Sequence, residues 1–208
     1  MIYLASRSPR RLELLAQLGI ECRLLLDDDE SRAESLETAL SGETPASYVQ
    51  RVAMAKTQAA LHRLAASGLP AAVLLCADTT VAVGNTILGK PQDAADAARM
   101  LRLLSGRSHK VLSAVVVATA SRSRLLTGMQ VSRVRFSRLK TPQIEAYIAT
   151  GEPFGKAGAY AIQGRAAGFI RAIEGSHSGI MGLPLFETAQ LLRKAGYSTL
   201  PHAPMTAP

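Results

Sequence analysis

The sequence contains no tryptophan, and aromatic residues make up only 4% of its 208 residues. Proteins that bind single-stranded nucleic acid stack the bases on aromatic side chains, and this chain offers few such platforms. It also has no run approaching the roughly 18 consecutive apolar residues that a membrane helix requires. The start, MIYLASRSPRR, lacks a long apolar stretch after its basic residues, so a secretory signal is not expected.

Cysteine and histidine are also scarce, with two and four residues respectively. Cys22 and Cys76 lie in apolar runs, and no C-x-x-C pair occurs. We therefore expect both thiols to be reduced core residues, as is typical of a cytoplasmic protein. The histidines are scattered along the chain, so a zinc site is not expected.

The charge is strongly unbalanced, because 24 Lys and Arg residues against 16 Asp and Glu residues leave a formal net charge of +8. Such a charge favours polyanionic partners, either nucleic acid or nucleotide phosphates, or it reflects a solvated basic surface with no binding role. Charge alone does not choose among these. The 48% of hydrophobic residues is ample for a core at this length, which favours one compact domain or two lobes that share a core.

Hydrophobic periodicity and turn residues predict a mixture of strands and helices. Strands are expected at residues 2–4, 20–26, 71–83, 87–88, 110–120, 125–136 and 169–173. Helices are expected at residues 45–66, 94–104, 141–151 and 184–195, and another is expected to begin at Ser8 as N-cap with Pro9 at the first helical position. Without strict alternation, this order predicts an α/β domain with a large twisted mixed sheet.

We expect residues 1–197 to form a single domain of two lobes. Residues 152–164 contain three glycines and are expected to form a loop. Residues 198–208 contain three prolines and little to bury, which is typical of a flexible tail.

The stretch GNTILGKP, residues 84–91, comes close to a phosphate-binding P-loop. Pro91 stands where that loop needs a Ser or Thr hydroxyl, and proline offers no N–H either. Gly84 and Asn85 are a typical hairpin turn between two strands. The sequence therefore predicts a hairpin here rather than a P-loop.

Several charged residues lie where packing does not favour them. Asp78 interrupts a buried strand, where a charge needs a reason. Arg10 and Arg11 fall in the first turn of a helix, the end at which the helix dipole favours anions. Lys56 lies on a helix, and Lys90 follows the hairpin.

Carboxylates and cations of this kind are the parts needed to bind a divalent metal and a triphosphate. Glu30 supplies a second carboxylate, after the strand at 20–26. Spacing alone does not show that these residues meet.

Three blocks of sequence resemble the Maf family of nucleotide pyrophosphatases and occur in the family's order. They are 4-LASRSPRRLELLAQLG-19, 77-ADTTVAVGNTILGKPQDAADAARMLRLLSGRSHKV-111, and 156-KAGAYAIQG-164 with 182-GLPL-185. The resemblance extends over about residues 2–196. It implies an inosine triphosphatase-like fold with two lobes around a deep cleft. It also implies hydrolysis of nucleoside triphosphates to the monophosphate and pyrophosphate with a divalent metal, Mg, Mn or Co.

The resemblance assigns roles to particular residues. Asp78 would be the proton acceptor that activates water, and with Glu30 it would hold the metal. The phosphate-facing cations would be Arg11, Lys56 and Lys90. Taken singly, Asp78 could equally cap a turn, and the other charges could lie on a solvated surface.

The resemblance is finest at Arg10, Thr79 and Gln163, which match the branch of the family that acts on dTTP and UTP. The amide of Gln163 can pair with the donor and acceptor edge that uracil and thymine share. Alternatively, this amide bonds only its own loop. The chain departs from the family pattern at Gly155, Ala161 and His177, where the family has Asp, Gly and Tyr.

We therefore expect a cytoplasmic hydrolase acting on dTTP and UTP; modified pyrimidine nucleotides as further substrates and a homodimer are left open. Two other classes remain: a regulatory binding protein linked to septum formation, as the family name implies, and a nucleic-acid-binding module. An enzyme would turn over free nucleotide, whereas a phosphate-backbone binder would lose affinity steeply with salt.

Overall fold

The computed structural model describes residues 1–27 and 36–198 of the chain. The described residues form a seven-stranded mixed sheet in the order β2-β1-β3-β5-β6-β7, with β4 paired to β3 off this path. The strands are β1 (Ile2–Leu4), β2 (Cys22–Leu24), β3 (Leu74–Val83), β4 (Thr86–Leu88), β5 (Ser108–Ala118), β6 (Leu125–Phe136) and β7 (Ile170–Glu174). β1 is parallel to β2 and β3, and the other pairs are antiparallel, so the mixed α/β sheet expected from the sequence is confirmed.

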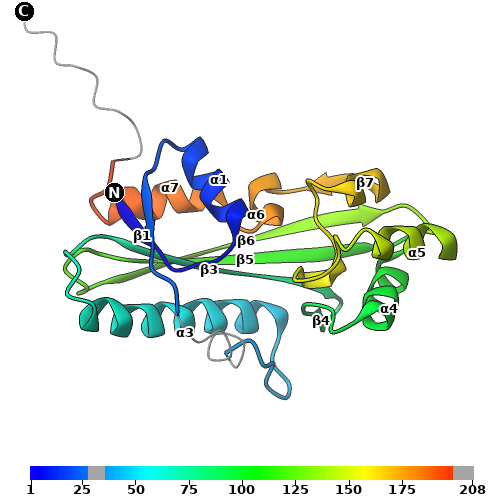
Figure 1. Cartoon of the computed structure of the whole chain (residues 1–208), viewed down its shortest axis with the longest axis horizontal. Helices are drawn as coiled ribbons and strands as arrows, with labels where there is room; N and C mark the ends of the chain where they lie inside the picture. Colours follow the sequence, from blue (N-terminus) through cyan, green and yellow to red (C-terminus); the bar gives the residue numbers. More distant parts are fainter. Residues whose placement is uncertain (28–35, 199–208) are drawn as a thin grey trace, which may run out of the picture.

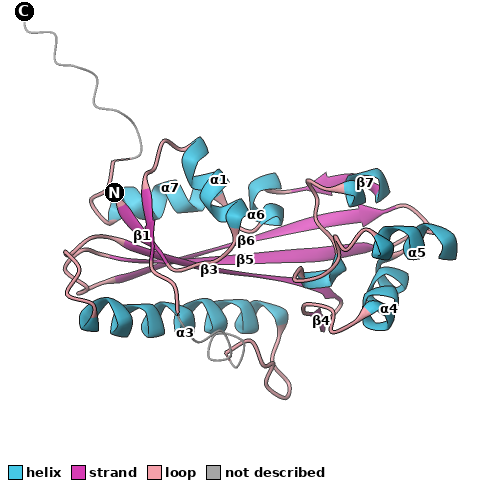
Figure 2. Ribbon diagram, in the orientation of Figure 1, coloured by secondary structure: helices cyan, strands magenta, loops and turns pink. Residues whose placement is uncertain are grey.

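The helices cover the sheet in two groups (Figures 1 and 2). α1 (Pro9–Gln17) and α7 (Leu185–Lys194) lie on one face of the sheet, and α3 (Pro45–Ala66) lies along the opposite face. α4 (Ala94–Leu104) and α5 (Thr141–Ala149) lie together near the other end of the long strands. The short helices are α6 (His177–Met181) and the 3₁₀ turns η1 (Ala157–Ala159) and η2 (Arg165–Phe169).

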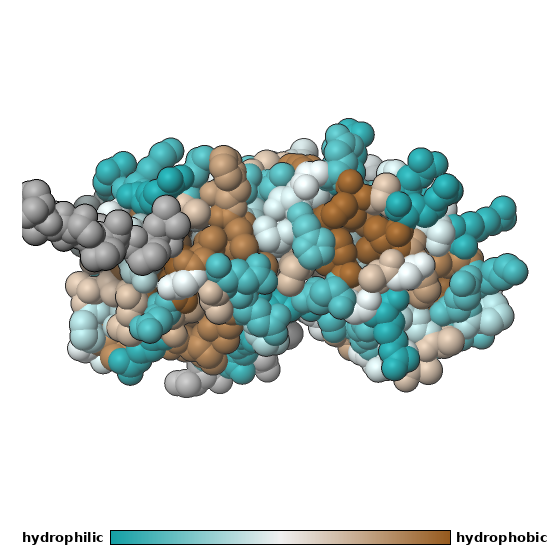
Figure 3. Space-filling model, turned by 90° about the horizontal axis from the view of Figure 1, so that it is seen from above, coloured by the Kyte–Doolittle hydropathy of each residue, from teal (hydrophilic) through white to brown (hydrophobic). Residues whose placement is uncertain are grey.

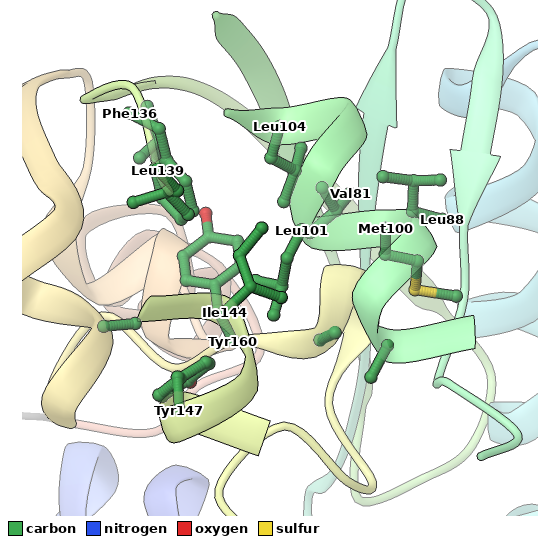
Figure 4. Packing of buried hydrophobic residues seen from close by; sticks show 14 of the residues in the cluster. Val81, Leu88, Met100, Leu101, Leu104, Phe136, Leu139, Ile144, Tyr147 and Tyr160 are labelled. Atoms are coloured by element: carbon green, nitrogen blue, oxygen red, sulfur yellow. The ribbon is translucent and has the colours of Figure 1, made fainter. Parts of the chain in front are cut away.

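Separate hydrophobic cores hold the two ends of the sheet. At the end of the sheet that carries the N-terminus, one core lies under α1 and α7 and another lies under α3. At the other end, Leu101 and Leu104 of α4 pack with Ile144, Phe136 and Tyr160 (Figure 4). Because β3 and β5 contribute residues to the cores at both ends, the two lobes share one sheet.

Most predicted elements are confirmed to within a few residues, with three differences. The strand expected at 20–26 is only Cys22–Leu24. Ser8 is the N-cap of α1, but its side chain makes no capping hydrogen bond, so Pro9 alone carries the start signal. α6 was not predicted, because five residues are too few to show a helical period.

The hairpin at Gly84 is confirmed and the P-loop is excluded. Val83 of β3 pairs with Thr86 of β4, and Gly84 between them takes φ of 59°. A side chain there would be strained, which explains the glycine. The predicted tail, residues 198–208, lies outside the described residues except for Ser198. None of the helices in the described ranges is both long and apolar enough to cross a membrane.

Candidate active site

The site lies along an unpaired edge in the middle of β3. β1 pairs with Leu74 and Leu75 of this strand, and β4 pairs with residues 81–83. Between them, residues 76–80 pair with β5 on one side only, as far as the described residues show. The chain therefore leaves an opening between the two lobes where the backbone and both faces of β3 can be reached.

Neighbouring side chains of β3 point to opposite faces of the sheet. Asp78 faces α3, where it meets Lys56, and Thr79 faces the other side, where it meets Gly182. Both nevertheless line one cavity of about 900 Å³, because the cavity reaches around the unpaired edge. In the view from above, a hydrophilic to neutral band separates the hydrophobic surface of the two halves (Figure 3).

Lys56 joins two carboxylates on the α3 side. Its Nζ donates to Oδ1 of Asp78 and to Oε1 of Glu37, at 2.7 Å in each case. The other oxygen of Glu37, Oε2, lies 3.0 Å from Nζ of Lys90. These four side chains form one connected network of two ammonium groups and two carboxylates.

The pKa values of the two carboxylates are shifted in opposite directions. Burial raises the pKa of Asp78 above its usual range, although Lys56 and Arg11 oppose the shift. Burial also acts to raise the pKa of Glu37, but Lys56 and Lys90 more than offset it, so the Glu37 pKa is lowered. Asp78 is therefore the stronger proton acceptor of the two, whereas Glu37 stays ionised and orients the lysines.

Cations dominate the wall of the cavity. The described lining includes the carboxylates Asp27, Glu37 and Asp78 and the cations Arg7, Arg10, Arg11, Lys56, Arg63, Lys90 and Lys156. Field lines concentrate in a cleft lined mainly by one sign of charge, so this cavity attracts anions such as polyphosphates.

Arg11 and Thr79 meet at a single carbonyl on the other side of β3. Arg11 Nε donates to the Gly182 carbonyl at 2.9 Å, and its Nη1 donates to Ser6 Oγ at 3.1 Å. Thr79 Oγ1 lies 3.3 Å from the same carbonyl. Burial lowers the pKa of the Arg11 guanidinium from its high usual value, with Asp78 opposing the shift.

Arg10 and Gln163 line the same cavity, and the described residues leave polar groups of both side chains without a hydrogen-bond partner. Arg10 Nε is buried and unpaired within the part of the chain that the structure describes. Gln163 is exposed in the cavity wall, and no described residue bonds its amide. Its expected alternative, an amide bonded to its own loop, is therefore not observed. Both groups are available to a ligand.

The loop that carries Gln163 is fixed by a carboxylate. Glu152 accepts hydrogen bonds from the Tyr147 hydroxyl at 2.9 Å and from the backbone N–H of Arg165 at 2.9 Å. Gly158 approaches β3 so closely that a Cβ there would lie 2.9 Å from Val81 side-chain atoms, and its φ is 70°. Only glycine permits this contact between the loop and the strand that carries Asp78.

Seven of the eight predicted site residues line the cavity: Arg10, Arg11, Lys56, Asp78, Thr79, Lys90 and Gln163. The eighth, Glu30, lies outside the described residues. Sequence reasoning missed Glu37, whose carboxylate is held by Lys56 and Lys90 and whose carbonyl accepts a hydrogen bond from the Tyr48 hydroxyl. In the sequence, Glu37 is simply an acidic residue upstream of the helix at 45–66, and many surface loops contain such a residue.

The donor atoms present fit a divalent metal of the magnesium type. No group of three or more His, Cys, Asp or Glu side chains able to hold a metal occurs among residues 1–27 and 36–198. Two carboxylates, on Asp78 and Glu37, nevertheless meet across one ammonium in a cavity large enough for a nucleotide. Magnesium is usually held by one or two carboxylates together with substrate phosphates, so Asp78 and Glu37 are the candidate ligands among the described residues.

The fold and the site define a protein with a cationic cleft between two lobes and a buried carboxylate at its centre. Residues 1–195 match the model of the family described as Maf-like protein, and the chain belongs to this family. Two relatives called dTTP/UTP pyrophosphatase are similar over nearly their whole length. The one from Ralstonia nicotianae is 61% identical over 93% of this chain and 93% of its own, and the one from Albidiferax ferrireducens is 58% identical over 94% and 97%.

Among solved structures, a nucleoside triphosphatase, or dITP/XTP pyrophosphatase, from Mycobacterium abscessus aligns with 66% of this chain and 75% of its own. The TM-score is 0.40 and the sequence identity is 19%. This comparison does not establish a shared fold, whereas the seven-stranded mixed sheet is observed directly.

The raised pKa of Asp78 makes its effect on stability testable. A carboxyl group whose folded pKa exceeds its unfolded value binds more protons in the folded state, so ionising it as pH rises above about 3.8 costs stability. Asp78→Asn removes this cost at pH 7, and Lys56 keeps Glu37 as a partner. We expect an unchanged or higher melting temperature at pH 7.

Glu152→Gln is the control, for which we expect a change in melting temperature in the opposite direction. Burial acts to raise the pKa of Glu152, but hydrogen bonds from Arg165 N–H and Tyr147 outweigh it, so the pKa is lowered and the ionised group stabilises the fold at pH 7. This variant should melt at a lower temperature than the wild type. A large loss of stability in Asp78→Asn instead would mean that Asp78 is a structural anchor.

Proposed function

We propose that the chain hydrolyses dTTP and UTP to the nucleoside monophosphate and pyrophosphate. The observation that carries the proposal is a nearly buried Asp78, linked to Lys56, at the centre of a cationic cavity of about 900 Å³. Membership of the Maf family and relatives called dTTP/UTP pyrophosphatase at 58–61% identity support the substrate assignment.

Asp78 is the proton acceptor for the attacking water in this proposal. A general base works best when its pKa approaches the operating pH, and burial moves the Asp78 pKa in that direction. Lys56 holds the carboxylate of Asp78 through Oδ1. No hydrogen bond between described side chains uses Oδ2. That oxygen is available to take a proton from water.

The cations neutralise the triphosphate. Lys90 is about half exposed at the cavity wall, and Arg11 lies on the opposite side of β3 near the start of α1. The N-terminus of α1 adds backbone N–H groups that favour an anion. In this proposal a chain of phosphates spans these groups, with its α–β bond near Asp78.

Asp78 and Glu37 would hold a divalent cation, with Glu30 as a further predicted ligand. When bound, such an ion neutralises charge on the phosphates and lowers the pKa of a coordinated water. Magnesium, manganese and cobalt all accept the carboxylate and phosphate oxygens that this site offers.

The chemistry predicts a specific set of products. Wild-type protein incubated with dTTP and Mg, Mn or Co should release pyrophosphate, detected separately from phosphate. Asp78→Asn keeps the shape of the side chain but removes the base, so turnover should fall by about two to four orders of magnitude. Near-normal turnover would remove Asp78 from the mechanism, and release of single phosphates would point to a different reaction.

Base recognition falls to Arg10, Thr79 and Gln163 in this proposal. Both Arg10 and Gln163 have unused donors at the cavity wall. An amide offers two donors and an acceptor oxygen, which complement the C=O and N–H groups of uracil and thymine. Thr79 adds a hydroxyl from β3.

We expect kcat/KM for dTTP and UTP to exceed that for CTP, ATP and GTP by at least about tenfold, or about 1.4 kcal/mol. Gln163→Ala should remove most of this preference and leave turnover of the poorer substrates intact. Gln17→Ala is the control, because Gln17 is exposed at the end of α1 and does not line the cavity. A wild-type preference for a purine triphosphate would overturn the base assignment.

A cytoplasmic location remains part of the proposal. Cys22 and Cys76 are both free of disulfide bonds, as expected in a reducing compartment. A homodimer stays a prediction. Nucleic-acid binding is not favoured, because seven cations among the described residues line a single cavity of nucleotide size.

A further inference from the structure

A buried serine lies directly behind Thr79. Ser113 of β5 faces Thr79 of β3 in the strand register, and it is only 1% exposed. Its Oγ lies 2.8 Å from Thr79 Oγ1 and 2.6 Å from the Gly179 carbonyl oxygen in α6. Nothing in the sequence distinguishes Ser113 from other strand serines, and its contacts become apparent only in the folded chain.

These distances fix the direction of the hydrogen bonds. A carbonyl oxygen can only accept, so the single Ser113 proton is directed at Gly179. The contact between Ser113 and Thr79 is then a hydrogen bond only if Thr79 donates. The competing acceptor of the Thr79 proton, the Gly182 carbonyl, is farther away at 3.3 Å.

A Thr79 hydroxyl whose proton points inward presents only lone pairs to the cavity. The Gly182 carbonyl beside it, which Arg11 holds at 2.9 Å, is also an acceptor. This part of the wall therefore complements an N–H donor. Uracil and thymine carry such a donor at N3 between two carbonyl groups, whereas N3 of cytosine is an acceptor.

We propose that Ser113 is a positioning residue that fixes Thr79 as a hydrogen-bond acceptor and so selects an imide N–H on the base. The inference rests on the proposed function, because it takes the base to lie against Thr79. It adds the reason for rejecting cytosine, which has the same size as uracil. A cytosine N3 facing Thr79 would meet a second acceptor and leave both groups unpaired.

The chain offers a matched control in Ser132 of β6. Ser132 is also 1% exposed, and it holds the same segment as Ser113 at a different point. Its Oγ lies 3.2 Å from the Ser176 carbonyl and accepts the Ser176 N–H at 3.0 Å. It makes no hydrogen bond to Thr79, so Ser132→Ala disturbs the segment without changing the direction of the Thr79 proton.

The test compares kcat/KM for dTTP and dCTP in the wild type, Ser113→Ala, Ser132→Ala, Thr79→Val and the double variant Ser113→Ala/Thr79→Val. In Ser113→Ala the Thr79 hydroxyl becomes free to donate to cytosine N3. We expect the preference for dTTP to fall about tenfold, with an absolute rise in kcat/KM for dCTP. Damage to the fold would lower kcat/KM for both substrates and cannot produce this rise.

The double variant should show the same preference as Thr79→Val alone, because Ser113 acts through Thr79. Ser132→Ala should keep the wild-type preference even if its melting temperature falls. Ser113→Cys fills nearly the same space with a weakly hydrogen-bonding group and should also lose preference, which keeps the test valid if Ser113→Ala fails to fold.

An unchanged preference in Ser113→Ala or Ser113→Cys, with the wild type preferring dTTP, overturns the role of Ser113 and leaves the proposed function standing. Equal losses in Ser113→Ala and Ser132→Ala overturn it as well. A wild type that hydrolyses both nucleotides without preference overturns the inference and the expected base preference, but leaves pyrophosphate release standing. One that hydrolyses neither overturns the proposed function as well.

Discussion

The contact between Lys56 and Asp78 is the interaction on which the site depends. An aspartate in the middle of a buried strand is costly unless it is paired, and Lys56 supplies the pairing at 2.7 Å. The same ammonium holds Glu37, which in turn holds Lys90, so one buried charge organises residues from α3, β3 and two loops. The ion pairs that balance the buried charge of Asp78 therefore also position the other charged groups of the site.

The sheet makes this arrangement possible by leaving β3 unpaired over residues 76–80. A strand with neighbours on both edges would bury Asp78 and Thr79 on separate faces, out of reach of one ligand. The gap lets one cavity touch both side chains, with Lys56 beside Asp78 on the α3 side and Arg11 and Gly182 beside Thr79 on the α1 and α6 side. The two lobes are the consequence of one long sheet with a break along its edge.

Local patterns in the sequence predicted much of the fold, because its helices and strands are long enough to show a period. Helix 45–66 has the predicted bounds, and Asp78 was conspicuous as a charge within an apolar strand. Glu37 and Ser113 were not predicted, since each gains its meaning from partners 19 to 66 residues away in sequence. Similarly, α6 is held by contacts to neighbouring strands rather than by a periodic pattern.

The proposed reaction requires that the α–β phosphate bond of a pyrimidine nucleoside triphosphate lies beside Asp78. The most direct measurement is a crystal structure with the non-hydrolysable analogue α,β-imido-dUTP and magnesium. We expect the α–β bridge next to the Asp78 carboxylate, phosphates near Lys56 and Lys90, and uracil against Thr79 and Gln163. A γ-phosphate beside Asp78, or an analogue bound outside the cavity, would contradict this expectation.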